Sequence, residues 1–458
     1  MRGMHLRHLH VQNVKLLRDT TVSFTDASGS PRMWTVFVGE NRLCKTTLLQ
    51  TIAAAAAGGD HGTQLVTDVV ASWPDLRLAE PVEAAIDATF GFSRERHARR
   101  EYPGFEISRD DPSREGAASP APGIELLSTL RLPPGRRVLT GDSRFIGWPP
   151  WSLDAPEPQD ILTIARAKSL RDWFVAGYGP TRLLPSPGKA ARSFDPMQDR
   201  LRPLFGESLI GTGFVDLLSP ELGRAFAKLL HKVFVEGGLL PHVTKLELRG
   251  RGGIQSAKDL VEAHRFELAT GNGSSIRVPA GWLSQGYQSL IAWVADFVGH
   301  ILLEAGAAIE ASEMEGLVLV DEIDLHLHPT WQVKLIPALK KVFPRLQFIA
   351  TTHSPMVLPG LEAEEVWLLE QNEEGSVTAR PSTRAPALLT GSELYGSFFD
   401  MNDLYPNRLG EKARRYGNLA TDPTRSDDED HEVLRLRAEL ARAGVTFDWD
   451  PVAREAAE

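Results

Sequence analysis

The sequence of 458 residues contains one cysteine, Cys44. A single thiol excludes an internal disulfide framework and a zinc site built on cysteines. Long apolar runs are also lacking. The most apolar helical window, residues 287–309, is interrupted by Asp296, His300 and Glu304, so it cannot span a bilayer comfortably. The first ten residues are rich in histidine and lack the apolar segment of a secretory signal. We therefore expect a cytoplasmic protein without a membrane partner.

The composition excludes a mostly disordered, fibrous or membrane-embedded chain, because 42% of the residues are apolar and 24% are charged. The net charge of −10 comes entirely from residues 361–458, which hold 11 basic and 21 acidic side chains. Residues 94–202 are slightly basic, with 18 basic and 14 acidic side chains. A local basic patch is enough to bind DNA phosphates. A DNA-contacting face in this segment is one interpretation, and a mixed solvated surface is the alternative.

Alternating strand and helix patterns predict a mostly parallel sheet covered on both faces. Ten of the 31 prolines fall between Pro103 and Pro158, where the periodicity collapses into loops and short strands. The expected strands are 5–11, 20–24, 33–38, 173–178, 317–320, 347–350 and 365–370. The expected helices are 46–57, 161–171, 222–235, 287–307, 330–342, 406–416 (ending at Gly417) and 427–443.

A phosphate-binding loop is indicated where the apolar strand 33–38 runs into Gly39 and then into a helix. Such a loop needs a lysine that reaches the β- and γ-phosphate oxygens and a hydroxyl for Mg²⁺. Lys45 and Thr46 stand at the required distance from Gly39, and the helix N-terminus adds its dipole. Cys44 stands where this pattern normally has glycine. The alternative is an ordinary strand-to-helix turn with a surface lysine.

A pair of carboxylates, Asp321 and Glu322, ends the apolar strand 317–320. Ligands of open α/β folds bind at the carboxyl edge of the sheet, where this pair is expected to lie. There Asp321 can hold Mg²⁺ and Glu322 can polarise an attacking water. The alternative is a strand that ends in a solvated acidic turn.

Three other polar sites stand near strand or helix ends. Ser284 and Gly286 precede a long helix, where a hydroxyl and free N–H groups can face an anion. His353 follows the strand 347–350, where it can contact a γ-phosphate. His326 and His328 have metal-like spacing, but they lack further ligands at sensible spacing, so we expect a turn there.

In this order, the elements resemble the ATP-binding-cassette (ABC) head of the RecF, SMC and OLD-type ATPases. The Walker A motif corresponds to residues 39–47, the signature to 283–288, the Walker B motif to 317–322 and the switch histidine to His353. Residues 321–332 and 351–355 carry the most specific part of the resemblance. It implies an α/β P-loop NTPase fold with a mixed or parallel sheet, an inserted helical lobe and a C-terminal helical tail.

On this resemblance the chain divides into six expected segments. They are an N-terminal head part at 1–91, a Pro/Gly-rich insertion at 92–170, a head strand at 171–182, a helical-lobe insertion at 183–275, a C-terminal head part at 276–370 and an acidic helical tail at 371–458. The resemblance covers about 1–60, 172–182 and 275–370. The segment 177–182 lies where the family has a lobe-connecting glutamine, and it supplies none.

The resemblance also implies cofactors and site residues. ATP and Mg²⁺ would be bound in a head-to-tail homodimer, with the signature of one subunit facing the Walker A motif of the other. It assigns catalysis to Glu322 and His353, metal binding to Thr46 and Asp321, and nucleotide binding to Gly39, Asn41, Lys45, Thr46, Thr47, Ser284 and Gly286.

The stand-alone layout resembles the ATPase subunits of Septu-type and retron-associated anti-phage systems, which act with a separate nuclease. The acidic tail is expected either to dock such an effector or to pack as a solvated helical hairpin. A RecF-like DNA repair ATPase is an alternative. A nucleotide-gated scaffold with little hydrolysis is another, because Arg42 and Cys44 replace the usual loop glycines and Gln285 replaces a signature glycine.

Overall fold

The computed structural model describes residues 4–75, 77–78, 80, 82–92, 124–146, 162, 174–182, 196–206, 218–247, 265–270, 273–399, 401 and 408–453. The described residues form two units, Met1–Leu388 and Leu389–Glu458. Most of the expected Pro/Gly-rich insertion and the expected helix at 161–171 lie outside the described residues.

A six-stranded sheet with the order β14-β13-β3-β12-β11-β7 organises the first unit. Every pair in it is parallel except β13 with β14. The strands β3, β11, β12 and β7 are fully buried, as continuous apolar runs in parallel sheets usually are. Their bounds are β3 Trp34–Val38, β7 Val175–Tyr178, β11 Gly316–Val320, β12 Leu346–Thr351, β13 Val366–Gln371 and β14 Val377–Pro381.

An antiparallel sheet with the order β2-β1-β4-β5-β6 forms a second layer. Its strands are β1 His5–Val14, β2 Leu17–Ser23, β4 Ala84–Phe92, β5 Ile124–Leu132 and β6 Thr140–Ile146. Helix α1 (Lys45–Ala57) shares one hydrophobic core with both sheets, and 12 of its 13 residues are buried. Burial on all sides explains its run of five alanines, 53–57, which lets neighbouring backbones approach closely. The short helix α2 (Gly59–Val66) follows α1 and contacts it.

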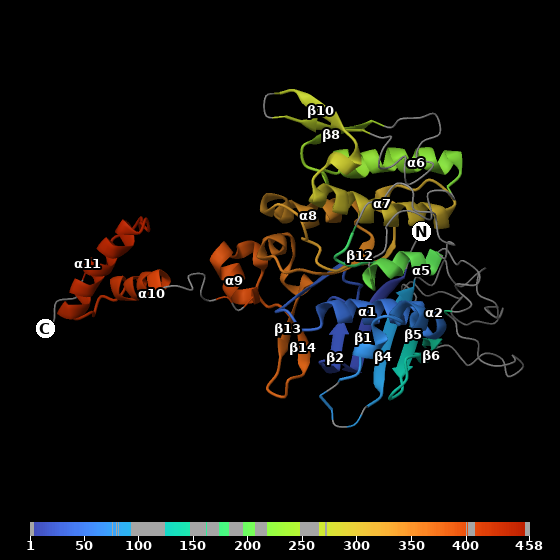
Figure 1. Cartoon of the computed structure of the whole chain (residues 1–458), viewed down its shortest axis with the longest axis horizontal. Coiled ribbons are helices and arrows are strands. Elements are labelled where there is room, and N and C mark those ends of the chain that lie inside the picture. The colour runs from blue at the N-terminus through green and yellow to red at the C-terminus, as the bar shows by residue number, and fades with distance from the viewer. Residues whose placement is uncertain are drawn as a thin grey trace, which may run out of the picture. The chain divides into compact units, whose positions relative to one another are not determined.

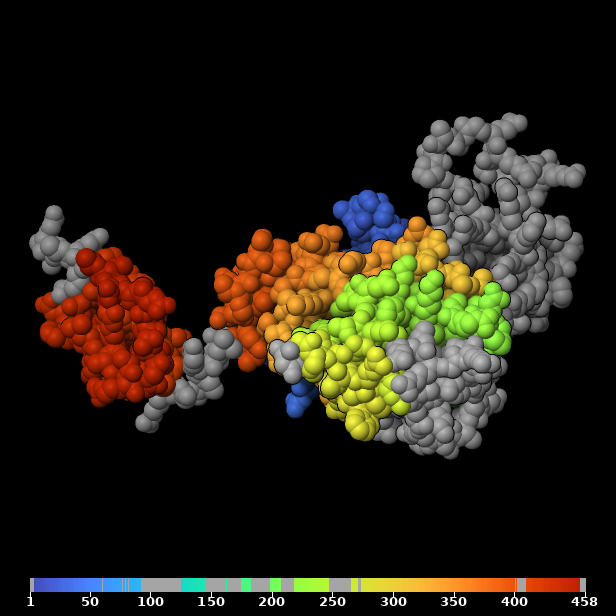
Figure 2. Space-filling view, turned by 90° about the horizontal axis from the view of Figure 1, so that it is seen from above, coloured from blue at the N-terminus to red at the C-terminus, as the bar shows by residue number. Residues whose placement is uncertain are grey.

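Two other helices flank the six-stranded sheet: α7 (Gln285–Ala305) and α8 (Pro329–Val342). The α7 helix is largely buried and contacts α6 (Pro220–His231), which Figure 1 shows running alongside it. After α6 one π-helical turn, Lys232–Glu236, continues the helix expected at 222–235. A small sheet of β8 (Val243–Glu247), β9 (Arg265–Ala269) and β10 (Ser275–Val278) lies beside α6, as Figure 2 shows in green and yellow. The short helix α5 (Pro196–Leu201) contacts β7.

The second unit contains α9 (Gly391–Phe399), α10 (Arg408–Ala420) and α11 (Asp427–Arg442). Helices α10 and α11 form a hairpin with its own core, centred on Tyr416, Leu436 and Leu440. The expected capping box at the start of α11 is confirmed, with Ser426 and Glu429 as its two members.

The structure differs from the sequence expectation in several places. Residues 183–275, expected to be a helical lobe, also contain the strands β8 and β9. Residues 377–381, assigned to the tail, form β14 in the main sheet. Residues 124–146, assigned to an insertion, contribute β5 and β6 to the sheet that contains β1. The helix expected to end at Gly417 continues to Ala420, because Leu419 and Ala420 are buried in the hairpin core.

None of the helices in the described part of the chain combines the length and the apolarity that a bilayer crossing needs.

Candidate nucleotide site

The phosphate loop connects β3 to α1 and contains two non-glycine residues with a left-handed backbone. Arg42 has φ 81° and Cys44 has φ 59° with ψ 23°. Both stand where glycine is usual in this motif, and the structure shows why: the loop needs positive φ at these positions. The cysteine therefore keeps the glycine-like backbone at a cost in strain, which for an L-residue is about 1–2 kcal/mol.

Lys45, the first residue of α1, has its ammonium group turned toward the loop. Its Nζ donates to the carbonyl oxygens of Gly39 at 2.7 Å and Glu40 at 2.8 Å. Burial lowers the pKa of Lys45 to about 8, against the opposing influence of Asp321 and Glu322. A desolvated cation at a helix N-terminus, within a curled loop, is suited to bind phosphate oxygens.

The acidic end of β11 meets the start of α1 through a direct hydrogen bond. The hydroxyl of Thr46 donates to Oδ2 of Asp321 at 2.7 Å, and the hydroxyl of Thr351 donates to Oδ1 at 2.6 Å. Asp321 is 2% exposed. A hydroxyl and a carboxylate oxygen at this separation are the kind of oxygen donors that Mg²⁺ prefers, so these residues fit the metal. Thr46 and Asp321 are far apart in the sequence, and the β3-β12-β11 strand order brings them together.

Glu322 follows Asp321 in a tight turn, with φ 48°. Its N–H donates to Oγ1 of Thr351 at 2.8 Å, so one threonine fixes both acidic residues. Burial raises the pKa of Glu322, and the neighbouring carboxylates of Asp321 and Asp324 raise it further. A half-buried carboxylate with a raised pKa has the basicity needed to accept a proton from water.

A second hydrogen-bonded group follows the acidic turn. Asp324 accepts from the hydroxyl of Thr352, and its carbonyl accepts from Nε2 of Gln332 at 3.3 Å. Ser354 Oγ donates to Oε1 of Gln332 at 2.7 Å, so α8 is tied to the end of β12. His353, between these two hydroxyl residues, is exposed. Partial desolvation of its ring and the nearby Lys45 lower the pKa of His353, so it is predominantly neutral near pH 7.

The signature residues lie at the N-terminus of α7. Ser284 is the N-cap, yet its side chain makes no capping hydrogen bond and is exposed. Gly286 is buried, and a Cβ added there would lie 2.5 Å from the carbonyl oxygen of His326. Glycine is therefore required for α7 to contact the turn after the acidic strand. Trp282, just before the signature, is 80% exposed.

The two histidines with metal-like spacing have local roles. His328 is the N-cap of α8, and its Nδ1 accepts from the N–H of Thr330 at 3.4 Å. His326 is exposed, with φ 65°. Within the described ranges, no group of three or more His, Cys, Asp or Glu side chains could hold a metal ion. Residues 321–326 form a turn between β11 and α8, which confirms the turn predicted here.

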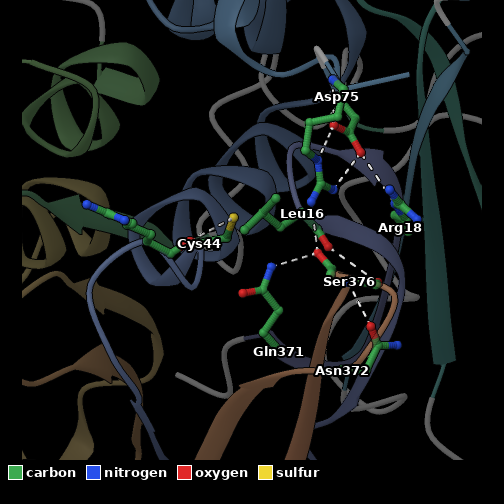
Figure 3. Close-up of polar contacts among 10 residues, drawn as sticks. Leu16, Arg18, Cys44, Asp75, Gln371, Asn372 and Ser376 are labelled. Carbon is green, nitrogen blue, oxygen red and sulfur yellow. Dashed lines mark hydrogen bonds and ion pairs between the residues drawn. The ribbon is translucent and has the colours of Figure 1, made fainter. Parts of the chain in front are cut away.

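Two residues outside the predicted set also lie at the site. Lys15, in the β1–β2 turn, donates from Nζ to Oγ1 of Thr47 at 3.0 Å and brings a second cation to the start of α1. Lys15 has a φ of 52°, which its residue type does not reveal, so no feature of the sequence indicates this contact. Figure 3 shows Leu16 from the same turn beside Cys44.

Arg182, the second residue outside the set, lies buried behind the acidic turn and donates to the carbonyls of Asp321 and Glu322. The structure thus brings together Lys45, Thr46, Asp321 and Glu322. It connects Gly286 to the turn at His326, and it leaves Asn41, Ser284 and His353 exposed.

The strand–loop–helix phosphate loop, the hydroxyl–carboxylate contact and the parallel sheet define an α/β P-loop ATPase head of the ABC type. The family described as "AAA domain, putative AbiEii toxin, Type IV TA system" matches residues 35–358, and the chain belongs to this family.

Two curated relatives match parts of the chain. The Septu protein PtuA of Bacillus mycoides (strain KBAB4) is 36% identical over 162 residues, 35% of this chain and 22% of the relative. The retron Ec83 probable ATPase of Escherichia coli is 42% identical over 92 residues, 20% of this chain and 17% of the relative. The chain thus spans about a fifth of the length of these curated relatives. These matches confirm the resemblance to Septu and retron ATPases.

One solved structure, described as the SmcHead bound to the C-winged helix domain of ScpA, is 15% identical with a TM-score of 0.47. That alignment covers 84% of this chain and 100% of the other.

Proposed function

We propose that the chain binds ATP with Mg²⁺ and hydrolyses it. The observation that carries this proposal is the 2.7 Å hydrogen bond between Thr46 and Asp321, which joins the phosphate loop to the acidic strand end. A hydroxyl and a carboxylate so placed can share one metal ion. Lys45 is one residue away and carries a desolvated ammonium for the phosphates.

The residues of the site divide the chemistry between them. Lys45 and the loop N–H groups from Gly39 to Thr47 bind the phosphates, with Asn41 at the exposed rim, while Thr46 and Asp321 bind Mg²⁺. When bound, the metal neutralises charge on the phosphate oxygens. Glu322 accepts a proton from the attacking water, for which its raised pKa suits it. Neutral His353 contacts the γ-phosphate as a hydrogen-bonding partner.

Ser284 supports a head-to-tail homodimer. Its hydroxyl is exposed at a helix N-terminus and makes no capping bond, so it is available to a nucleotide on a second subunit. In this arrangement Ser284 and Gly286 complete the site from the partner. Light scattering of the Glu322→Gln variant tests the arrangement. A dimer that forms when ATP is added, and not without it, supports the arrangement. A monomer under those conditions contradicts it.

The names of the relatives support a role in anti-phage defence, in which the ATPase controls a separate effector such as a nuclease. The α10–α11 hairpin is the segment we propose for docking that effector, because it has its own core apart from the ATPase head. Deletion of residues 408–453 should abolish co-purification of an effector expressed with the chain. ATP hydrolysis should remain.

Phosphate release with Mg²⁺ and ATP tests the enzymatic proposal. Wild type should release phosphate, and Glu322→Gln should reduce the rate at least 100-fold, because the amide cannot accept the proton. Glu373→Gln, an exposed glutamate in the β13–β14 turn, is the matched control and should keep the wild-type rate. Equal rates in wild type and Glu322→Gln would reject Glu322 as the base.

The left-handed backbone of Arg42 and Cys44 favours one second candidate, a nucleotide-gated scaffold. Tight ATP binding without phosphate release from wild type would select it. ATP-strengthened DNA binding that weakens steeply with salt would instead favour a repair ATPase.

A further inference from the structure

Arg182 is buried at the carboxyl edge of the main sheet, four residues after β7, and is 4% exposed. Its guanidinium donates from Nη1 to the carbonyl oxygen of Asp321 at 2.6 Å and from Nη2 to that of Glu322 at 2.7 Å. Nη1 also donates to the carbonyl of Gly179 at 3.2 Å, and Nε donates to Oγ of Ser289 at 3.1 Å. One side chain therefore connects the segment after β7, the acidic turn and helix α7.

Sheet topology explains how a residue so distant in sequence reaches the acidic turn. β7 pairs in parallel with β11, with Tyr178 opposite Val320. The N–H of Asp321 donates to the carbonyl of Tyr178 at 2.8 Å, so the ends of β7 and β11 lie side by side at the edge of the sheet. Arg182 follows Tyr178 by four residues, and its side chain reaches the carbonyls of Asp321 and Glu322.

Burying a guanidinium is costly unless its charge and donors are satisfied. The four acceptors here are three carbonyl oxygens and one hydroxyl. The carboxylates of Asp321, Asp324 and Glu322 supply the opposing charge, and the pKa of Arg182, lowered by burial to about 10, leaves it protonated near neutrality. The planar fork of arginine reaches two carbonyls at once, which an ammonium on a flexible stem does not reproduce.

The two main-chain acceptors flank the Cα atom of Glu322. The carbonyl of Asp321 precedes its φ bond, and the carbonyl of Glu322 follows its ψ bond. Glu322 has φ 48°, an unfavourable conformation for a residue with a long side chain, which persists only where surrounding contacts impose it. By binding both carbonyls, Arg182 fixes the backbone from which the Glu322 carboxylate projects.

We propose that Arg182 is a positioning residue for Glu322 and couples the acidic turn to the signature helix through Ser289. The inference rests on the proposed ATPase function and adds to it a residue that touches neither ATP nor metal. Ser289 is five residues after Ser284 on the same helix, so displacement of α7 is transmitted to the turn that carries Glu322.

Substitutions at Arg182 test the proposal by separating turnover from nucleotide binding. Arg182→Lys should lower kcat at least 30-fold, and Arg182→Met should lower it further. The affinity for fluorescent ATP should stay within threefold of wild type, because the phosphate loop is untouched. Ser289→Ala, which removes only the link to α7, should lower kcat about threefold to tenfold.

Arg32→Lys is the matched control. Arg32 is also buried, at 7% exposed, and donates to the carbonyls of Glu364 and Ser23, away from the acidic turn. It should keep kcat within twofold of wild type. An effect of Arg182→Lys matched by Arg32→Lys would overturn the proposal, because it would show general destabilisation.

Hydrogen exchange provides a readout that does not depend on hydrolysis. In Arg182→Lys, the amides of Glu322–Leu325 should exchange at least tenfold faster than in wild type, and those of β3 should not change. Unchanged exchange in that turn would overturn the proposal even if wild type proved inactive. A kcat within threefold of wild type in Arg182→Lys, or a parallel fall in ATP affinity and kcat, would also overturn it. By contrast, a wild type without turnover rejects the ATPase proposal itself, and a turnover that Glu322→Gln leaves unchanged rejects Glu322 as the base.

Discussion

The phosphate loop and the acidic turn both contain non-glycine residues in left-handed conformations, but different contacts hold them in place. In the loop, Lys45 donates to the loop's own carbonyls, and the sulfur of Cys44 makes a long 3.9 Å contact to the carbonyl of Arg42. In the turn, Glu322 is held by Arg182 and by Thr351 from a neighbouring strand. Side chains from two other elements thus bind the backbone of the turn, while the ammonium of Lys45 binds carbonyls of the loop that precedes it.

This difference predicts different responses to mutation. Several contacts from other elements hold the acidic turn in one conformation. A change that disturbs its packing should therefore move Glu322 and remove turnover. In the phosphate loop the positive φ is needed, but the Cβ of Cys44 that makes it unfavourable is not, so replacing Cys44 with glycine should be tolerated or stabilising. The following predictions test this contrast from the largest expected effect to the smallest.

Gly286→Ala should have the largest effect. The added Cβ would lie 2.5 Å from the carbonyl oxygen of His326, so either α7 or the acidic turn must move. We expect kcat to fall more than tenfold and stability to fall by about 1–3 kcal/mol, measured by phosphate release and urea unfolding. Gly206→Ala, where an added Cβ meets nothing within 4 Å, is the control and should match wild type. A wild-type kcat in Gly286→Ala would show that the turn is not rigid.

Cys44→Gly should have a smaller effect, of opposite sign. Glycine adopts φ 59° without the Cβ clash, although its greater freedom in the unfolded chain offsets part of the gain. We expect a net stabilisation of up to about 1 kcal/mol in urea unfolding and a turnover at least equal to wild type. Cys44→Ala retains a Cβ and should give no gain. A destabilised Cys44→Gly would contradict the strain in the loop.

Asp75→Asn should have the smallest effect on stability. The Asp75 carboxylate acts through the β1–β2 turn beside the loop. Arg77 and Arg18 donate to its carboxylate, as Figure 3 shows for Arg18, and the N–H of Lys15 donates to the carbonyl of Trp73 at 2.6 Å. The hydrogen bond from Arg77 lowers the pKa of Asp75 to about 2 from 3.8. Because the folded pKa is depressed, this stabilisation is present above pH 4 and is lost as the pH falls from about 4 toward 2.

The stability difference between wild type and Asp75→Asn should therefore shrink as the pH falls. We expect the difference in unfolding free energy to fall by about 1 kcal/mol at most between pH 5 and pH 3, measured by urea unfolding. The change is small because both arginine partners are partly exposed and screened by solvent. A difference that stays constant over this range would show that the Asp75 carboxylate does not titrate with a depressed pKa in the folded protein.

Local sequence signals predicted the elements that carry the motifs. The helix expected at 46–57 begins one residue earlier, at Lys45, and the strand expected at 347–350 is β12, Leu346–Thr351. These segments have strong local patterns, an apolar run that ends in glycine or in polar residues. The same patterns placed Lys45 and Asp321 at the same edge of the sheet, because parallel strands present their carboxyl ends on one edge.

The remaining features depend on tertiary neighbours that the sequence does not display. Arg182 reaches the acidic turn only because β7 pairs with β11, across about 140 residues of chain. β14 was assigned to the tail because it lies within a polar stretch of the sequence, and most of its residues are exposed or partly buried, as expected for an edge strand paired on one side. Positive φ at Glu322 likewise leaves no trace in residue type.

A paired measurement of nucleotide binding and turnover in Lys45→Ala and Glu322→Gln tests the central claim most directly. The phosphate loop should control binding, and the acidic turn should control hydrolysis. We predict that Lys45→Ala weakens ATP binding at least 30-fold and abolishes phosphate release. Glu322→Gln should bind ATP within threefold of wild type and release phosphate at least 100-fold more slowly. Equal losses of binding and turnover in the two variants would contradict the account.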